Sequence, residues 1–179
     1  MESGQIKVSK TSLCGVLKIE RYAFRDLRGM YGETYAPEVY KEHGINMELN
    51  AEDNFSVSKK NVLRGIHGDD RTWKLISCLQ GTFNLVVLNF DRESDQFGQW
   101  ESFTLSRENM LQVLVPPKFG NGHLILTDEA MFHYNQSHRY QGAQNQFTIR
   151  WDDPKFNIQW PINGPILSRR DAEAPYVQQ

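Results

Sequence analysis

Apolar and polar residues alternate along most of the middle of the chain, in short runs rich in β-branched and aromatic side chains. In the run TFNLVVLNF at 82–90, Phe83, Leu85 and Val87 share one face, and the opposite face also carries apolar residues, so we expect both faces to be covered. Such runs at short and even intervals predict a β-sandwich or a β-barrel. The predicted strands cover residues 16–24, 74–81, 82–90, 99–106, 110–117, 123–140 and 146–151.

Turn and helix signals fit between these runs. Gln80 and Gly81 predict a tight hairpin between two strands. Residues 36–44 predict a short helix, with proline near its start and glycine at its end. The proline-rich segment from 160 to the C-terminus predicts a strap around the barrel, with a helical turn that begins at Ser168.

Length, composition and charge narrow the class of protein. A chain of 179 residues predicts a single domain over 1–179. With 20 Lys and Arg against 22 Asp and Glu, the surface lacks the basic excess of a nucleic-acid-binding protein. No apolar segment is long enough for a membrane span, and Cys14 and Cys78, both flanked by leucine, are expected as buried thiols in a reducing compartment. We therefore expect a cytoplasmic protein without membrane or nucleic-acid partners.

Candidate chemistry begins at VLRGIHGDDRTWKL (62–75), where charged residues interrupt a strand-like run. A metal-binding cupin would need two histidines and a glutamate here and a third histidine downstream. Only His67 is present, and Asn121 stands where the last histidine would be, with His123 two residues further. We expect no metal site.

Two other interpretations stay open at this point. One histidine, one tyrosine and a carboxylate suffice to move a proton next to a carbonyl, if a cation or hydrogen-bond donor stabilises the enolate oxygen. Alternatively, His67 is a satisfied turn histidine and the neighbouring charges are solvated.

The motifs VLRGIH, VLVPPKFGNGHLIL, FHYNQSHRY, IRWDDPKFNIQWPI and PILSRRDAEAP occur in this order along the chain. This ordered set resembles the dTDP-4-dehydrorhamnose 3,5-epimerase family over nearly the whole sequence. The resemblance implies an all-β, cupin-type jelly-roll barrel with a few short helices, usually a homodimer. It also implies a substrate that is a nucleoside-diphosphate 4-keto-6-deoxy sugar, and no metal or other cofactor.

The resemblance assigns roles to four catalytic positions. His67 matches the base, and an imidazole has a reference pKa of about 6.5, which suits proton abstraction near neutrality. Asp171 matches the aspartate that orients this histidine, Tyr134 matches the acid on the opposite face of the sugar, and Lys74 matches a lysine near the C4 oxygen. Six other positions match substrate-binding positions of the family, some of them in the neighbouring subunit: Arg28, Tyr31, Glu33, Asn54, Arg64 and Tyr140. Glu52 and Asn121, which differ from the family's residues, are expected to bind substrate as well.

The sequence departs from the family pattern in three places. The family's RGLHYQ reads RGIHGD, which puts Asp69 and Asp70 near the base and suits a larger sugar such as a heptose. The family's PPGFAHGF reads PPKFGNGH, so Asn121 replaces a histidine, and inversion at C3 alone becomes an alternative to inversion at C3 and C5. Glu52 stands near a usual glutamine and favours GDP weakly over dTDP.

The resulting hypothesis is a metal-independent epimerase of surface polysaccharide biosynthesis, acting between a 4,6-dehydratase and a C4 ketoreductase. Two alternatives remain: a sugar-nucleotide 3,4-ketoisomerase on the same barrel, and a module that binds a nucleotide sugar without turnover.

Overall fold

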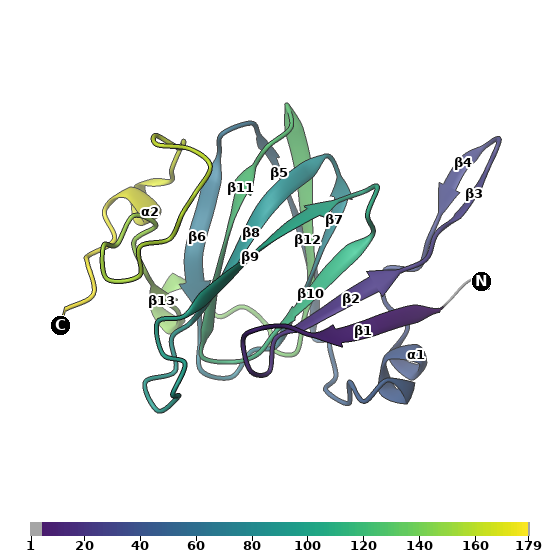
Figure 1. Ribbon diagram of the computed structural model, residues 1–179, viewed down its shortest axis with the longest axis horizontal. Helices are drawn as coiled ribbons and strands as arrows, with labels where there is room; N and C mark the ends of the chain where they lie inside the picture. The colour runs from purple at the N-terminus through teal and green to yellow at the C-terminus, as the bar shows by residue number, and fades with distance from the viewer. Residues whose placement is uncertain (1–4, 179) are drawn as a thin grey trace.

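Two antiparallel sheets face each other and a two-stranded hairpin projects from one side in the computed structural model, which describes residues 5–178 (Figure 1). The six-stranded sheet has the order β1-β2-β10-β7-β12-β5, and the five-stranded sheet has the order β13-β6-β11-β8-β9. The strands of the first sheet are β1 (Ile6–Lys10), β2 (Leu17–Arg21), β5 (Glu52–Lys59), β7 (Lys74–Gln80), β10 (Leu111–Val115) and β12 (Glu129–Gln136). Those of the second are β6 (Leu63–Gly68), β8 (Thr82–Asn89), β9 (Trp100–Ser106), β11 (Phe119–Ile125) and β13 (Phe147–Thr148). The remaining elements are the hairpin β3 (Phe24–Asp26) and β4 (Gly29–Tyr31), the helices α1 (Pro37–Glu42) and α2 (Arg169–Ala172), and a 3₁₀ turn (Ala143–Asn145).

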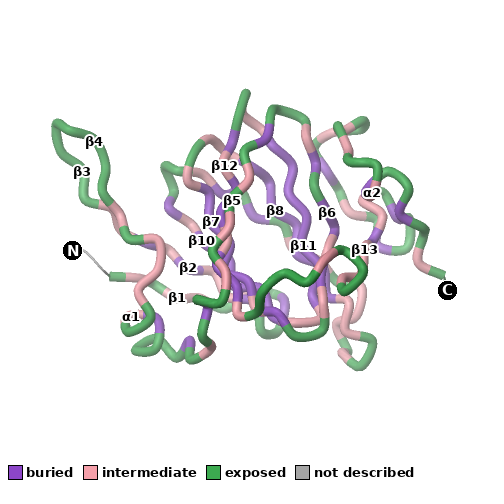
Figure 2. Tube along the Cα trace, turned by 180° about the vertical axis from the view of Figure 1, so that it is seen from behind, coloured by how far each residue is buried: buried purple, intermediate pink, exposed green. Residues whose placement is uncertain are grey.

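The main core lies between the two sheets. Phe83, Leu85 and Val87 of β8 point into it and meet buried residues of β7, β10 and β12. The other face of β8 is apolar too, and its Val86 and Leu88 are fully buried on the outer side of the five-stranded sheet. The central strands are accordingly buried along their length (Figure 2), which confirms that both faces of this run are covered.

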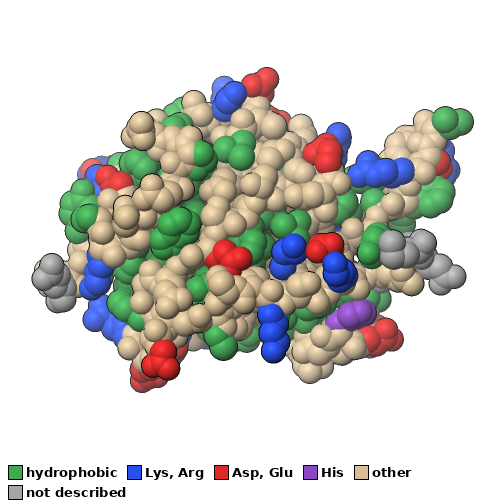
Figure 3. All heavy atoms as spheres, viewed as in Figure 1, with side chains coloured by type: hydrophobic (Ala, Val, Ile, Leu, Met, Phe, Trp, Pro, Cys, Tyr) green, Lys and Arg blue, Asp and Glu red, His purple; other side chains and the backbone are tan. Residues whose placement is uncertain are grey.

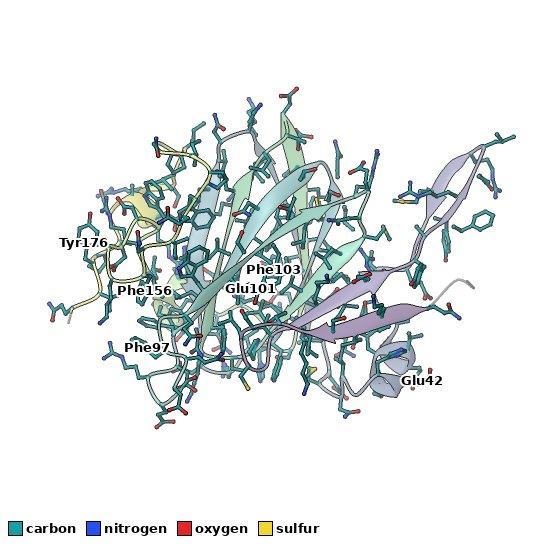
Figure 4. All side chains as sticks on the ribbon, viewed as in Figure 1. Glu42, Phe97, Glu101, Phe103, Phe156 and Tyr176 are labelled. Atoms are coloured by element: carbon teal, nitrogen blue, oxygen red, sulfur yellow. The ribbon has the colours of Figure 1, made fainter. Side chains whose placement is uncertain are left out.

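The C-terminal strap covers the outer side of the five-stranded sheet, as the sequence predicts. Phe156 and Trp160 pack there against β6, β8 and β11, and the indole of Trp100 donates a hydrogen bond of 3.0 Å to the carbonyl of Phe156. Phe97 and Phe156 lie together at this edge (Figure 4), with ring centroids 6.3 Å apart. The strap contains α2, whose first turn is capped by Ser168.

Several expectations need correction. Gln80 and Gly81 do not join a hairpin, because β7 and β8 belong to different sheets and the turn passes between the layers. The run 123–140 is two strands, since β11 ends at Ile125 and β12 starts at Glu129. Cys78 is buried, but Cys14 is exposed in the turn between β1 and β2. Both thiols are free.

Helix α1, expected over 36–44, covers the outer side of the six-stranded sheet. Tyr40 of this helix packs with Ile19, Leu75 and Leu114, and its hydroxyl donates to the buried side chain of Gln112. No helix within the described residues has the length and apolar character needed to cross a membrane.

A β-bulge in β6 determines which of its side chains face the interior. In the pairing with β11, Asn121 lies opposite His67 and His123 lies opposite Arg64, so β6 has one extra residue between these two pairs. Residues three apart on a regular strand face opposite sides, but here Arg64 and His67 both line one internal cavity. Gly65 lies in this bulge with a φ of +111°, a backbone conformation that is unfavourable for a residue with a side chain.

Gly65→Ala should destabilise the protein by about 2 kcal/mol or more, because a Cβ there would lie 2.6 Å from the backbone of Asn121 and Gly122. Gly164→Ala is the matched control, since a Cβ at that position meets nothing within 4 Å. Urea unfolding measures both free energies. Equal stabilities of the two variants would contradict this account of the bulge.

Candidate active site

A cavity of about 410 Å³ opens between the two sheets, beside α2. Eight of the residues that the resemblance selects line it: His67, Asp171, Tyr134, Lys74, Arg64, Asn54, Asn121 and Tyr140. Glu52 lies just behind them, where its carboxylate accepts hydrogen bonds from the side chains of Asn54 and Gln136 and from the backbone of Tyr140. The cavity thus gathers residues that are up to 117 positions apart in the sequence, from Asn54 to Asp171.

His67 and Asp171 form a hydrogen-bonded pair in the cavity. Nε2 of His67 lies 2.6 Å from Oδ1 of Asp171, and the hydroxyl of Ser168 donates to Oδ2 at 2.8 Å. Asp171 is 2% exposed. Burial alone would raise the pKa of its carboxyl, but hydrogen bonds and the charge of His67 outweigh it, so the pKa lies below its usual value. The carboxylate therefore stays ionised and holds the imidazole ring in one orientation.

Tyr134 enters the cavity from the opposite sheet. It is on β12, paired with Asn54 of β5, whereas His67 is on β6 of the five-stranded sheet. Burial raises the pKa of the Tyr134 phenol, and the neighbouring Asn54 partly offsets this. The phenol is therefore protonated at neutral pH and can act as a proton donor facing the histidine side.

Lys74 brings a buried positive charge to the cavity. Its Nζ donates to the amide oxygen of Asn121 at 3.2 Å. No carboxylate oxygen of residues 5–178 lies within 4.0 Å of this Nζ, so Lys74 forms no salt bridge with them. Burial lowers the pKa of the Lys74 amine, since desolvation disfavours its charged form. A neutral amide partner leaves this cation available to an oxyanion that forms in the cavity.

Two arginines add further positive charge. Arg64 donates to the hydroxyl of Ser58, and Arg170 donates to Thr148 and Gln146. Neither forms a salt bridge with a carboxylate of the described residues. Because a guanidinium matches the geometry of phosphate oxygens, either arginine of this cavity suits a diphosphate.

His123 also lines the cavity, although it is 4% exposed. Burial, together with the nearby charges of Arg64 and His67, lowers the pKa of its imidazole to about 3. The sequence alone raised this residue only as a metal ligand, yet the described residues contain no group of three His, Cys, Asp or Glu side chains that could hold a metal ion.

Arg170 and Gln146 line the cavity without having been selected from the sequence. The SRRD motif puts two arginines next to Asp171, but only the orientation of the short helix α2 decides which one faces inward. Conversely, Arg28, Tyr31 and Glu33 lie on or beside the projecting β3–β4 hairpin and line other surface hollows.

The family model of dTDP-4-dehydrorhamnose 3,5-epimerase matches residues 10–179. The chain belongs to this family. Its relatives include the dTDP-4-dehydrorhamnose 3,5-epimerase of Salmonella typhimurium, which is 36% identical over 176 residues and 96% of each chain. The family has the cupin-type fold, and membership makes this protein an isomerase of the epimerase class.

Solved structures agree with the family. The dTDP-6-deoxy-D-glucose-3,5-epimerase of Legionella pneumophila, in complex with dTDP-4-keto-L-rhamnose, has a TM-score of 0.90 and 33% identity, covering 96% of this chain and 93% of that one. A 3'-monoepimerase of Streptomyces bikiniensis, in complex with dTDP-quinovose, has a TM-score of 0.86 and 29% identity, covering 93% and 85%. Epimerases with different outcomes thus share this fold.

The buried imidazole of His123 should make stability depend on pH. Its pKa in the folded protein is lower than in the unfolded chain, so unfolding takes up a proton between pH 6.5 and about 3, and stability falls as the pH falls through that window. Relative to pH 7.5, His123→Phe should lose about 2 kcal/mol less stability at pH 5.0 than the wild-type epimerase does.

Urea unfolding at the two pH values measures this difference, and His43→Gln, which changes an exposed histidine, should behave as the wild type does. If His123→Phe showed the wild-type pH dependence, the imidazole would already be protonated in the folded protein.

Proposed function

We propose that the protein epimerises C3, C5 or both carbons of a nucleoside-diphosphate 4-keto-6-deoxy sugar, without a metal, with His67 as the base and Tyr134 as the acid. One observation carries the proposal. An imidazole held by a buried carboxylate and a protonated phenol reach the same cavity from opposite sheets. Epimerisation requires this arrangement, because a proton leaves one face of the sugar and another arrives on the other face.

The geometry supports the following steps. The C4 ketone acidifies the protons on C3 and C5, and a ring nitrogen of His67 takes one of them. The electron pair of the broken C–H bond forms an enolate, whose negative charge on the C4 oxygen is stabilised by Lys74. Tyr134 then donates its proton to the opposite face and the carbonyl reforms. Solvent afterwards returns a proton to the phenolate and takes one from the imidazolium of His67, which restores both groups. Asp171 stabilises the imidazolium in between.

For the nucleotide, we propose dTDP, with GDP as the alternative. The named ligands of the Legionella and Streptomyces enzymes are dTDP sugars. The argument for GDP depends on Glu52 as a free acceptor, but the oxygens of Glu52 already accept hydrogen bonds from Asn54, Gln136 and Tyr140. Arg64 and Arg170 would bind the diphosphate in either case.

For the sugar, a second hollow supports a substrate larger than a hexose. It has a volume of about 260 Å³, includes Asp69 and Asp70, and shares Gln136, Tyr140 and Gln146 with the main cavity. A heptose could place its additional hydroxymethyl group there, with a carboxylate as acceptor. Asn121 in place of a titratable histidine favours inversion at one carbon, an outcome for which the monoepimerase relative is a precedent.

Two other activities make less use of this site. A 3,4-ketoisomerase would have no need of a tyrosine acid facing the base, and a binding module would need neither. The substrate chemistry indicates the neighbouring reactions: a 4,6-dehydratase must supply the ketone, and a C4 ketoreductase would consume it. We propose that these three reactions take place in the cytoplasm and provide sugars for a surface polysaccharide.

We also propose that the protein is a homodimer. The β3–β4 hairpin projects from the sheets and exposes apolar side chains (Figure 3), among them Phe24, Leu27 and Tyr31. Phe55 is exposed on the edge strand β5. The hairpin also carries Arg28, which is distant from the cavity of its own chain and would serve the site of the partner. Light scattering should give twice the 20.8 kDa of the chain, and a mass of one chain would exclude the dimer.

The reaction is tested by NMR in D₂O with dTDP- and GDP-linked 4-keto-6-deoxy sugars that a dehydratase generates in place. We expect deuterium to enter at C3, at C5 or at both, and the activity to be unaffected by EDTA. An absence of exchange with every donor would contradict epimerase function. EDTA-dependent loss that Zn²⁺ or Fe²⁺ reverses would contradict the metal-free mechanism.

The assigned roles predict different defects in two variants. His67→Asn should lower the exchange rate by about a thousandfold, because the base is lost, while affinity for the nucleotide stays within a factor of about three. Tyr134→Phe should slow formation of the inverted product more than deuterium exchange, because abstraction does not require the phenol. Wild-type turnover in either variant would remove that residue from the mechanism.

A further inference from the structure

His123 has an unusual environment for a histidine. Its imidazole stacks on Phe132 with ring centroids 3.9 Å apart and an angle of 8° between the planes, and the ring of Phe83 lies 5.4 Å away. Both phenylalanines belong to the apolar core between the sheets. His123 therefore sits at the inner end of the cavity, where its lining meets the core.

One ring nitrogen of His123, Nε2, is buried without a hydrogen-bond partner among the described residues. A buried polar group without a partner destabilises a protein by about 1–3 kcal/mol, and an apolar side chain would avoid that cost. Phenylalanine would fill this space with the same stacking, so packing alone gives no reason for the two nitrogens.

The position of His123 relates it to both reacting groups. On its own sheet it is paired with Arg64, one bulge away from His67. On the facing sheet, its stacking partner Phe132 has its ring 5.4 Å from that of Tyr134. His67, Tyr134 and His123 line one cavity, so a sugar ring held between His67 and Tyr134 would lie near this imidazole.

We propose that His123 is a specificity-determining residue, whose imidazole forms a hydrogen bond with a hydroxyl group of the bound sugar. This inference depends on the proposed function, since it needs a sugar in the cavity. Because the ring stays neutral near pH 7, it offers one N–H donor and one acceptor nitrogen, and a hydroxyl can pair with either. The contact gives the imidazole a hydrogen-bond partner without adding a second base beside His67.

The role is specificity and not acid–base catalysis. A ring that stays neutral near pH 7 does not hold the proton that a general acid would deliver, and a proton that it accepted would leave a cation in an apolar pocket. The residue is expected to act on binding of the sugar in the ground state and the transition state alike.

The test compares His123→Phe with the wild type in calorimetric titrations with dTDP-quinovose and with dTDP alone, or with the GDP pair if the wild type turns over only GDP sugars. The variant keeps the stacked ring and removes both nitrogens. We expect about tenfold weaker binding of the nucleotide sugar, unchanged binding of the nucleotide alone, and a drop in kcat/KM that comes mainly from KM. His123→Leu, which also lacks the nitrogens, should show the same split.

Phe83→Leu is the matched control. It loosens the packing around the imidazole but keeps its nitrogens, so it should lower stability and leave the affinity for the sugar within a factor of about three. Wild-type affinity of His123→Phe and His123→Leu for the nucleotide sugar would overturn the proposal. Equal losses for the sugar and for the nucleotide alone would overturn it as well, because they would indicate a general defect.

Failure of the proposed function gives a different result. A wild type that binds dTDP-quinovose but exchanges no deuterium at C3 or C5 would not be an epimerase of this class, yet the affinity split between wild type and His123→Phe would still support the contact. A wild type that binds no nucleotide sugar at all would overturn both.

Discussion

The hydrogen bond between His67 and Asp171 depends on the strap, on helix α2 and on the bulge in β6. It joins two residues 104 positions apart, one on a strand of the five-stranded sheet and one at the end of the chain. The C-terminal strap packs on the outside of that sheet, and Ser168 caps α2, which holds Asp171 beside β6. The bulge at Gly65 brings His67 to the cavity side of its strand. The pair therefore depends on contacts between distant parts of the chain.

The cavity that results is electrostatically incomplete. Lys74, Arg64 and Arg170 lie around it without a carboxylate in salt-bridge contact among residues 5–178, while the carboxylate of Asp171 is committed to His67 and Ser168. Burying cations without counter-charges costs stability. A diphosphate and a developing enolate would supply those negative charges. The unpaired cations that lower the stability of the free protein would then favour binding of the substrate and of the transition state.

The sequence predicts best those features that depend on a single helix, strand or turn. The alternation in β8, the short helix α1 and the turn capped by Ser168 depend on neighbouring residues, and the structure confirms all three. Long-range features were less accessible. Gln80 and Gly81 look like a hairpin turn locally, but the strands they join pair with other partners in different sheets. Arg170 lines the cavity because of where α2 packs, and no local sequence pattern determines that position.

The candidate site shows the same division between residues that a motif identifies and residues that only the fold reveals. The resemblance selects His67, Asp171, Tyr134 and Lys74 by motif, and all four line the cavity. It assigns no role to His123. The importance of this residue emerges only from its burial and its unpartnered nitrogen.

The identities of residues 121 and 123 on β11 have a consequence for proton transfer in the cavity. Asn121 and His123 are two residues apart on one strand and both line the cavity, so this chain keeps a histidine on that face but places it next to the apolar core. Beside Lys74, the neutral amide of Asn121 can orient the amine but cannot exchange a proton with it near pH 7. Beside Phe132, burial keeps the imidazole of His123 neutral. Neither residue suits proton transfer at neutral pH, which agrees with the proposal that His67 and Tyr134 carry the protons to and from carbon.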